Sequence, residues 1–485
     1  MSEPNLTEVA KQLADTQTAI NFVWTLLAGF LVMFMQAGFA LVETGLTRAK
    51  NAAHTMGMNL MVYAIGIIGF WAVGFAFQMG GVGVLATLGG DDTLSSEAAI
   101  TIAGKSFGLL GLKGFFLTGA TFTPAVAVLF LFQMVFMDTA CTIPTGAMAE
   151  RWKFMSFVIF SLVVTTIIYP VYANWVWGGG WLSSLGKNFG LGHGHVDFAG
   201  SSVVHVTGGV LAFVGAKILG PRIGKFDKLG KAKPIAGHNI PMVVVGTFIL
   251  AFGWFGFNAG STLAGNDLQI GIVATNTLLA SASGAIGSYV YVTVRYGKPD
   301  VTMICNGTLA GLVAVTAPCA FVSAPAAILI GAVAGFLVVV SATFIEHTMK
   351  VDDPVGAVAV HGVNGVWGVV ALGLFANGTY GDGLNGVDGK VRGLLYGDGG
   401  QLAAECLGAL ANIVYVGAVA SAALYVIGKT VGNRVPASDE VLGLDMPEMG
   451  VQGYSDDAST SPAADDEALP APARVASVTR AGVAP

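Results

Sequence analysis

Charged side chains are scarce in this sequence. Asp, Glu, Lys and Arg make up only 11% of its 485 residues, whereas an average soluble chain carries about 25%. A chain with so little charge cannot cover several soluble domains. Its hydrophobic content of 54% and mean hydropathy of +0.71 indicate a membrane protein instead. The net charge of −6 and pI of about 5.6 offer no basic surface, so a nucleic-acid partner is not expected.

Cysteine and proline are also rare. The four cysteines, Cys141, Cys305, Cys319 and Cys406, lie in apolar segments, which favours buried small side chains over a disulfide framework or a metal cluster. With 17 prolines and no Gly-x-y period, the chain is not collagen-like. The sequence also lacks a nucleophile–base motif, a phosphate-binding loop and a dense set of metal ligands. We therefore expect no enzyme activity, no catalytic residue, no cofactor and no metal site.

Glycine, in contrast, is abundant. Its 68 residues are about twice the usual share of ~7%, and small residues allow helices to pack closely within a bilayer. Eleven apolar segments approach the length of about 20 residues that crosses a hydrocarbon core. They cover roughly residues 20–47, 55–80, 122–149, 154–174, 199–219, 239–260, 268–294, 301–318, 322–346, 355–376 and 401–428. The expected fold is an all-α polytopic membrane protein with eleven transmembrane helices.

Lysine and arginine indicate the orientation in the membrane, because they are enriched in cytoplasmic loops. Loops after odd-numbered spans contain Arg48, Lys50, Arg151, Lys153, Lys217, Arg222, Lys225, Lys228, Lys231, Lys233, Arg295, Lys298 and Lys350. The N-terminus and the other loops contain only Lys11, Lys105, Lys113, Lys187, Lys390 and Arg392. We therefore place the N-terminal segment 1–19 outside the cytoplasm. The eleven-helix domain 20–428 follows, and a tail, 429–485, lies in the cytoplasm.

The tail differs from the rest of the chain in charge and composition. It carries four basic and nine acidic residues, which is most of the net charge. After about residue 451 it is rich in Ser, Asp, Ala and Pro, and such a segment is expected to be disordered. Leu442, Leu444 and Met446 lie between acids just before that point, so this part of the tail is a candidate for docking.

An internal repeat relates two spans. Asp197 stands eight residues before His205 in the fifth span, and Asp353 stands eight residues before His361 in the tenth. Each is the last span of a five-span unit, the first over about 20–219 and the second over about 239–376. Because five is odd, the units have opposite orientations. Eight residues advance a helix by about 12 Å, so both histidines are predicted to meet near the middle of the membrane, where inverted-repeat transporters bind substrate.

These two histidines are the strongest pore candidates. An ionisable side chain at membrane depth is costly and usually functional, and at least one of the two rings should be neutral because two buried charges would repel each other. A neutral imidazole donates one hydrogen bond and accepts one, which suits a small neutral polar guest. The other five are interpreted as solvated surface residues near span ends: His54, His193, His195, His238 and His347.

For several side chains near the outer ends of spans, the sequence leaves two roles open. Asp197 is a helix cap, an attraction for a cation, or both. Trp177 and Phe136 are interfacial anchors or walls of a cation–π cage. Ser261 bridges helices or accepts a hydrogen bond from a cationic guest, and Phe257 packs in the core or meets Phe136 across a pore.

Two acids inside spans remain without a role from the sequence alone. Asp138 lies within the third span and Glu405 near the start of the eleventh. A buried acid needs a partner, so we expect one for Asp138, although the sequence does not identify it.

Six stretches match one known family in order and spacing. They are GAMAER (146–151), VWGGG (176–180), DFAGSSVVH (197–205), WFGFNAGS (254–261), DDPVGAVAVHG (352–362) and GLDMPEMG (443–450). Over about residues 20–455 the chain resembles the ammonium transporter family, which includes the yeast permeases and the Rhesus proteins. The prokaryotic ammonium transporter branch is the better match, because aromatic recruitment residues and the tail motif are present.

The resemblance implies roles for individual residues. Phe136, Trp177 and Ser261 match an outer recruitment site for ammonium, with Asp197 needed nearby. Two phenylalanines, Phe136 and Phe257, match a stacked gate. The pore-lining positions are matched by His205, His361 and Trp254.

The resemblance also implies an assembly. Family members are homotrimers in the plasma (inner) membrane with one pore per subunit, and their cytoplasmic tail contacts a PII-type signalling protein. Here Gly356 replaces an aspartate of some relatives, and the extension beyond Tyr454 exceeds the family pattern. The partners expected are thus ammonium or ammonia, the bilayer, two further copies of the chain and a PII-type protein.

Elementary energetics supports the same function. Moving a small cation into hydrocarbon-like surroundings costs several kcal/mol, and two histidines without a ring of charges cannot compensate that cost. Ammonium would therefore be recruited, deprotonated at the gate and conducted as ammonia, with co-transport of the proton left undecided. Three alternatives stay open: a channel for another neutral solute, an ammonium sensor that signals through its tail, and a proton-coupled carrier for larger metabolites.

Overall fold

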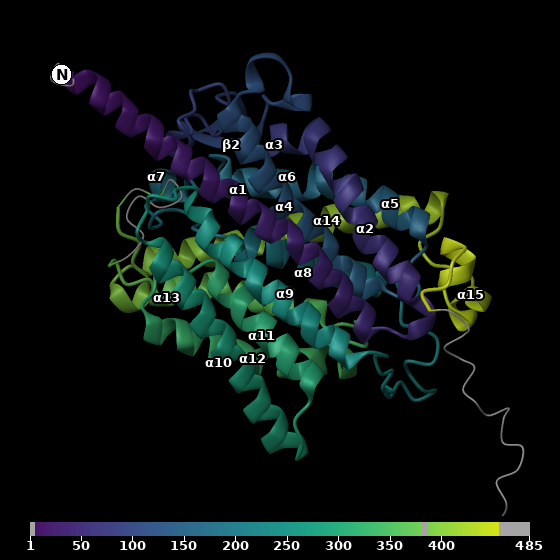
Figure 1. The fold of residues 1–485 in the computed structure, drawn as a ribbon. Helices are drawn as coiled ribbons and strands as arrows, with labels where there is room; N and C mark the ends of the chain where they lie inside the picture. Colours follow the sequence, from purple (N-terminus) through teal and green to yellow (C-terminus); the bar gives the residue numbers. More distant parts are fainter. Residues whose placement is uncertain (1–4, 380–386, 388, 455–485) are drawn as a thin grey trace, which may run out of the picture.

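A computed structural model describes residues 5–379, 387 and 389–454 of the chain. Long helices dominate it (Figure 1). Six of them are continuous: α1 (Leu6–Leu46), α4 (Pro124–Met148), α9 (Ile240–Asn258), α10 (Ile270–Tyr296), α12 (Ala324–His347) and α14 (Gly399–Thr430). The prediction that residues from about 451 onwards are disordered falls mainly on 455–485, outside the described residues.

Four further membrane-length runs change their helical winding along the way. Each contains a short π-helical segment, in which the backbone is wound more loosely. The runs are α2 (Ala52–Gly69), η2 (Phe70–Gly74) and α3 (Phe75–Met79); α5 (Phe154–Val163), η6 (Val164–Ile168) and α6 (Tyr169–Trp177); η7 (Ser201–Val206) and α8 (Thr207–Leu219); and η9 (Val358–Val363) and α13 (Asn364–Phe375). Such π segments are frequent at functional sites, and both predicted pore histidines lie in one.

Ten of these helices or runs are long and apolar enough to cross a membrane. The eighth predicted span corresponds to α11 (Val301–Thr316), which at 16 residues is shorter than the other ten. The structure therefore bears out a multi-pass helical membrane protein, and its described residues form ten membrane-length helices where the sequence predicted eleven. The described part of the N-terminal segment is helical from Leu6 onwards, where α1 begins.

Polar residues at the helix starts explain several boundaries. The side chain of Asp300 accepts hydrogen bonds from backbone N–H groups at the start of α11, and Asp398 does the same for α14. Asn239 and Thr123 cap α9 and α4 in the same way. Each cap satisfies N–H groups that have no partner inside the helix, so the apolar run can begin at that residue.

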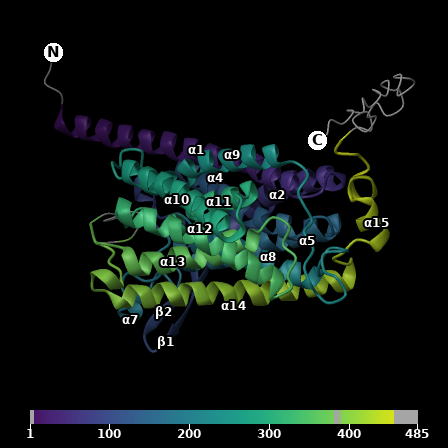
Figure 2. The ribbon, with the colours of Figure 1, turned by 90° about the horizontal axis from the view of Figure 1, so that it is seen from below.

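The helices form a bundle with two distinct ends. Helix α1 packs along α9 and α4, and α14 lies on the opposite side of the bundle, against α8 and α13 (Figure 2). The antiparallel hairpin β1 (Glu97–Ile102) and β2 (Lys105–Gly111) lies with α7 (Leu185–Phe189) at one end. The short helix α15 (Ala437–Leu442) lies at the other. We call these the Trp177 end and the Arg222 end, after a residue located at each.

Large apolar side chains cover parts of the outer surface. On α1, for example, Val23, Leu27 and Phe34 are all at least half exposed. Such surfaces suit lipid or another apolar partner. Three of the four cysteines are buried and all four are free, as expected, but Cys406 is exposed on α14. The prediction of burial is wrong for Cys406, because its side chain points away from the bundle.

The two histidine-bearing runs cross at a pair of glycines. A Cβ atom on Gly209 would lie 2.2 Å from the backbone nitrogen of Gly362, which no real side chain tolerates. Each of these runs also begins beside a glycine with positive φ, Gly200 at 117° and Gly356 at 79°, a conformation that glycine adopts without strain. The close crossing brings the histidine of one run next to the histidine of the other.

Candidate functional site

His205 and His361 face each other inside the bundle. Their Nδ1 atoms lie 3.1 Å apart and their ring centroids 5.2 Å apart, and both side chains are buried. A hydrogen bond between two Nδ1 atoms needs one N–H and one lone pair. At least one ring is therefore neutral. The Nε2 atom of His205 has no hydrogen-bond partner among the described residues, so the pair retains an unused polar atom.

Aromatic rings extend from His205 toward the Trp177 end. The ring of His205 stacks on Trp254 at 5.2 Å and on Phe257 at 5.5 Å. Phe257 in turn stacks on Phe136 with centroids 4.1 Å apart and an angle of 24°. The indole N–H of Trp254 donates to Thr316 Oγ1 at 2.9 Å, which holds the ring in place. Histidines and phenylalanines thus form one continuous buried file.

A small pocket lies at the far side of the phenylalanine stack. Phe132, Gln133, Phe136, Trp177, Phe198, Ser261 and Leu263 line it, and its volume is about 10 Å³. That is close to the smallest space that holds one water-sized molecule. The Ser261 hydroxyl donates to the Phe257 carbonyl at 2.8 Å, so its oxygen is left to accept. Aromatic faces and a free acceptor suit a small cation.

The pocket adjoins a wider vestibule at the Trp177 end. The vestibule has a volume of about 680 Å³, and its wall includes Gln133, Trp177 and Asp197. The sequence reading did not single out Gln133. Its side-chain oxygen accepts from Gln78 Nε2 at 2.7 Å, and it lines both the vestibule and the small pocket.

Asp197 caps the run that carries His205. One carboxylate oxygen accepts from the backbone N–H groups of Gly200 and Ser201, and the other from those of Ser202 and Val203, at 2.7–2.9 Å. The Ser202 hydroxyl adds a fifth bond at 2.7 Å. The capping role considered for Asp197 therefore matches the geometry, and its position in the vestibule wall is compatible with attraction of a cation.

His195 and Glu405 form a buried pair behind this cap. His195 Nδ1 lies 2.6 Å from Glu405 Oε2, and His195 Nε2 lies 2.8 Å from the Ser202 hydroxyl. Because Ser202 donates to Asp197 and Tyr172 donates to a backbone carbonyl, both oxygens can only accept from Nε2. These contacts fit a doubly protonated His195 ring.

The electrostatics of His195 agrees with that protonation state. Burial alone would lower the pKa of His195, but the neighbouring Glu405 and Asp197 carboxylates raise it above its ordinary value. The interpretation of His195 as a solvated surface residue is thus wrong, and so is that of His54, which is fully buried. For His195 the reason is its partner, Glu405, which lies 210 positions away in the sequence and could not be assigned from it.

Asp138 has no such partner. Its carboxyl group is buried in α4, and Oδ1 lacks a hydrogen-bond partner within the part of the chain that the structure describes. The expectation of a partner is therefore not met at this oxygen.

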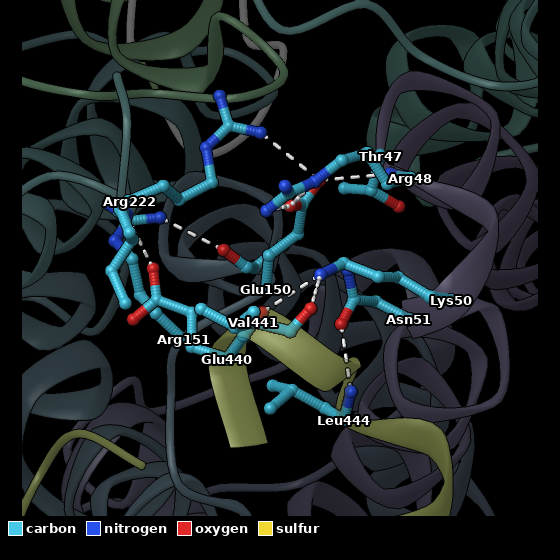
Figure 3. A network of polar contacts seen from close by, with 12 residues as sticks. Thr47, Arg48, Lys50, Asn51, Glu150, Arg151, Arg222, Glu440, Val441 and Leu444 are labelled. Atoms are coloured by element: carbon cyan, nitrogen blue, oxygen red, sulfur yellow. Dashed lines mark hydrogen bonds and ion pairs between the residues drawn. The ribbon is translucent and has the colours of Figure 1, made fainter. Parts of the chain in front are cut away.

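Ion pairs hold the Arg222 end together (Figure 3). Arg222 contacts Asp352 through three hydrogen bonds of 2.8–2.9 Å, and Glu150 through one of 3.1 Å. Arg48 contacts the other oxygen of Glu150. Glu150 has a φ of 71°, an uncommon backbone conformation for a side chain of its size that these contacts stabilise.

Charge pairing changes the acidity of this site. Burial would raise the pKa of Asp352, but hydrogen bonds and the charge of Arg222 lower it to about 2. Arg151 is fully buried beside it, and its partners among the described residues are backbone carbonyls, including that of Asp352 at 2.7 Å. The GAMAER stretch (146–151) therefore supplies an acidic residue, Glu150, and a basic residue, Arg151, to one structural network.

The tail docks on this network. Lys50 donates to the backbone carbonyls of Glu440 and Val441, and Leu444 N donates to Asn51 Oδ1 at 2.9 Å (Figure 3). Of the three apolar tail residues considered for docking, Leu444 is fully buried, whereas Leu442 and Met446 are exposed. Docking of this part of the tail thus uses Leu444, backbone hydrogen bonds, and the carboxylates of Asp445 and Glu448, which accept from the backbone N–H groups of His54 and Phe154 at 2.9 and 2.8 Å.

The fold and the buried file define a class of protein. Membrane-length helices, apolar outer surfaces and a narrow histidine-lined file that ends in an aromatic pocket are features of a multi-pass membrane transporter or channel. Comparison with known sequences specifies the family. The model of the Ammonium Transporter Family matches residues 23–454, and the chain belongs to that family. It is therefore a transport protein rather than an enzyme.

Individual relatives match over most of their length. Ammonium transporter Amt2 of Archaeoglobus fulgidus is 44% identical over 456 residues, which cover 93% of this chain and 92% of the relative. Ammonium transporter Amt1 of Haloferax mediterranei is 37% identical and covers 90% and 79%. Among solved structures, a protein named "Sensor Amt Protein" has a TM-score of 0.77 at 34% identity, with 90% and 99% coverage. Mep2 of Candida albicans has a TM-score of 0.71 at 28% identity, with 92% coverage of both chains.

Proposed function

We propose that this protein takes up ammonium, deprotonates it and conducts ammonia through the buried file of aromatic and histidine side chains. The observation that carries this proposal is the uninterrupted series from the aromatic pocket through Phe136 and Phe257 to His205 and His361. The names of its relatives, which are ammonium transporters, support ammonium as the substrate.

Ammonium is proposed to bind in the pocket formed by Phe136, Trp177 and Ser261. Aromatic faces attract a cation, and the Ser261 oxygen is free to accept one of its four N–H bonds. Asp197 contributes from the vestibule wall, where its negative charge increases the local concentration of cations.

Deprotonation is proposed at the Phe136–Phe257 stack. With ring centroids 4.1 Å apart, the stack leaves no space for a hydrated ion. A bare cation in such surroundings costs several kcal/mol or more, whereas neutral ammonia avoids that cost. Beyond the stack, ammonia can accept from one imidazole nitrogen and donate to another, with Trp254 as the wall of the pore.

The remaining features are part of the same proposal. The Arg222 end is assigned to the cytoplasm, because most loop lysines and arginines lie there. With α11 counted as a span, there are eleven helices. The first ten form two five-helix units of opposite orientation, and the N-terminus lies outside. A homotrimer in the plasma membrane, regulated by a PII-type protein through the tail, follows from the sequence resemblance, and the docked segment 443–450 supports a regulatory tail.

Uptake of radiolabelled methylammonium in cells tests this function. His205→Ala and His361→Ala should each reduce the rate at least tenfold or abolish the selectivity against potassium, because the guest then loses its hydrogen-bonding partners. His347→Ala is the matched control, since His347 is exposed. Unchanged rate and selectivity in both pore variants would contradict the proposal.

A sensor is the second candidate, favoured by the solved structure named "Sensor Amt Protein". Methylammonium flux, measured before and after removal of the residues that follow Tyr454, discriminates between the two functions. A transporter lacking this segment keeps its methylammonium flux, whereas a sensor shows little flux before or after the deletion.

A further inference from the structure

Glu43 is a buried acid that the proposed mechanism leaves unused. It lies one turn before the end of α1, and its side chain is 3% exposed. Within the described residues no lysine, arginine or histidine forms an ion pair with it, although such pairs exist for Glu150 and Glu405. An intramembrane acid without a cation is costly, so its retention in the wall of a cavity points to a function.

The cavity beside Glu43 also reaches His361. Its volume is about 20 Å³, enough for one water-sized molecule. Glu43, His361, Phe39, Ile143, Asn306 and Val360 are among the residues that line it. Phe39 lies next to the His361 ring, with centroids 6.1 Å apart. Glu43 follows Phe39 by four residues on the same face of α1, about 6 Å further toward the Arg222 end.

Hydrogen bonds around Glu43 allow it to hold a proton. The Thr145 hydroxyl lies 2.8 and 3.0 Å from the two carboxyl oxygens, but it also lies 2.6 Å from the Thr142 carbonyl. A hydroxyl has a single hydrogen. When that hydrogen points to Thr142, the Glu43 carboxyl group can donate its own to Thr145; when it points to Glu43, the carboxylate accepts it. Asn59 Nδ2 donates to the carboxyl group at 2.8 Å in both cases.

We propose that Glu43 carries the proton released from ammonium out of the pore at the Arg222 end. The histidine pair first accepts this proton from the ammonium at the phenylalanine stack, and then passes it through a water molecule in the cavity to the Glu43 carboxylate, which becomes the neutral acid. It then ionises and releases one proton to the solution at that end, so one proton moves for each ammonia. This inference rests on the proposed ammonium transport and adds the residue that makes transport electrogenic.

Purified protein in proteoliposomes tests the proposal. Currents after ammonium pulses are recorded on solid-supported membranes, and methylammonium flux is measured on the same preparation. Glu43→Gln keeps the shape and one acceptor but cannot carry a proton, so the ratio of current to flux should fall at least tenfold. Glu43→Asp, one methylene shorter, should give an intermediate ratio. Asp138→Asn is the matched control, because Asp138 is a buried acid that does not line the cavity, and its ratio should equal that of the unchanged protein.

The outcomes separate this proposal from the proposed function. Ammonium flux with an unchanged current-to-flux ratio in Glu43→Gln overturns the role of Glu43 but not ammonium transport. A proportional loss of both current and flux, an equal fall of the ratio in Asp138→Asn, or flux without current in the unchanged protein also overturns it. Absence of flux in the unchanged protein refutes the transport function itself. If Glu43→Gln does not yield folded protein, an unchanged ratio in Glu43→Asp decides against the proposal.

Discussion

The two ends of the buried file use charge differently. At the Trp177 end, Asp197 accepts hydrogen bonds from backbone N–H groups and from Ser202. The pair behind it, His195 and Glu405, becomes neutral when the proton on His195 Nδ1 moves to the Glu405 carboxylate. At the Arg222 end, Asp352 is held by an arginine whose charge is permanent. The first arrangement surrounds an open vestibule, and the second is closed over by the tail.

This difference shows how each end is stabilised. Permanent ion pairs fix loops and the tail at the Arg222 end, where the backbone of Glu150 adopts an uncommon conformation. At the Trp177 end the vestibule wall carries charges of both signs, Asp197, Asp267 and Lys187, and the Asp197 carboxylate is held by hydrogen bonds from its own helix start. Removing one member of each network should therefore have unequal consequences.

Arg222→Met should be the most destabilising change. It leaves the buried carboxylates of Asp352 and Glu150 with less compensation, and breaking a buried pair in this way costs about 3–5 kcal/mol. The free energy of unfolding is measured in detergent by titration with a denaturant. Lys225→Met is the control: its partner Glu346 is one-third exposed, so a loss below about 1 kcal/mol is expected. Equal losses in the two variants would remove the distinction between a fully buried ion pair and a partly exposed one.

Asp197→Asn and Asp353→Asn compare the two helix caps. Asp197 accepts five hydrogen bonds, whereas Asp353 accepts from Gly356 and Val358. An amide has only one acceptor oxygen, so we expect a loss of about 2–3 kcal/mol for Asp197 and about 1 kcal/mol for Asp353. Thermal unfolding of the two variants measures the difference. A larger loss at Asp353 would reverse the comparison.

Much of this organisation could be predicted from the sequence, because it depends on local patterns. Apolar length located the helices, and the eight-residue spacing of aspartate and histidine identified two equivalent helix starts. The count of membrane-length helices differs because α11 ends at Thr316, before a turn. A 16-residue helix extends only about 24 Å, which hydropathy alone did not distinguish from a full span.

Contacts between distant segments could not be predicted. His195 meets Glu405, and Glu43 meets Thr145 across 102 positions. A sequence gives the spacing within a helix but not the neighbours of that helix. Glu43 was also overlooked because it stands at a span end near Arg48, where an acid usually faces water. The ring geometry of Phe136 and Phe257 belongs to the same group: the family resemblance implied a stack, but only the fold gives a centroid distance of 4.1 Å.

Glu405→Gln should have a small effect with a distinct pH dependence. Without the carboxylate, His195 can lose its proton at little cost, because the ordinary pKa of histidine, about 6.5, is close to neutral pH; a loss of about 1 kcal/mol is expected at pH 7. In the unchanged protein the pKa of His195 is raised by Glu405 and Asp197 against the effect of burial. The stability that this provides is complete below pH 6.5 and is lost as the pH rises through the folded-state pKa. The difference between Glu405→Gln and the unchanged protein should therefore be greatest in mildly acidic solution and shrink at alkaline pH. Unfolding measured from pH 5.5 to pH 9.5 checks this, and a difference that grows with pH would show that His195 is neutral in the folded protein.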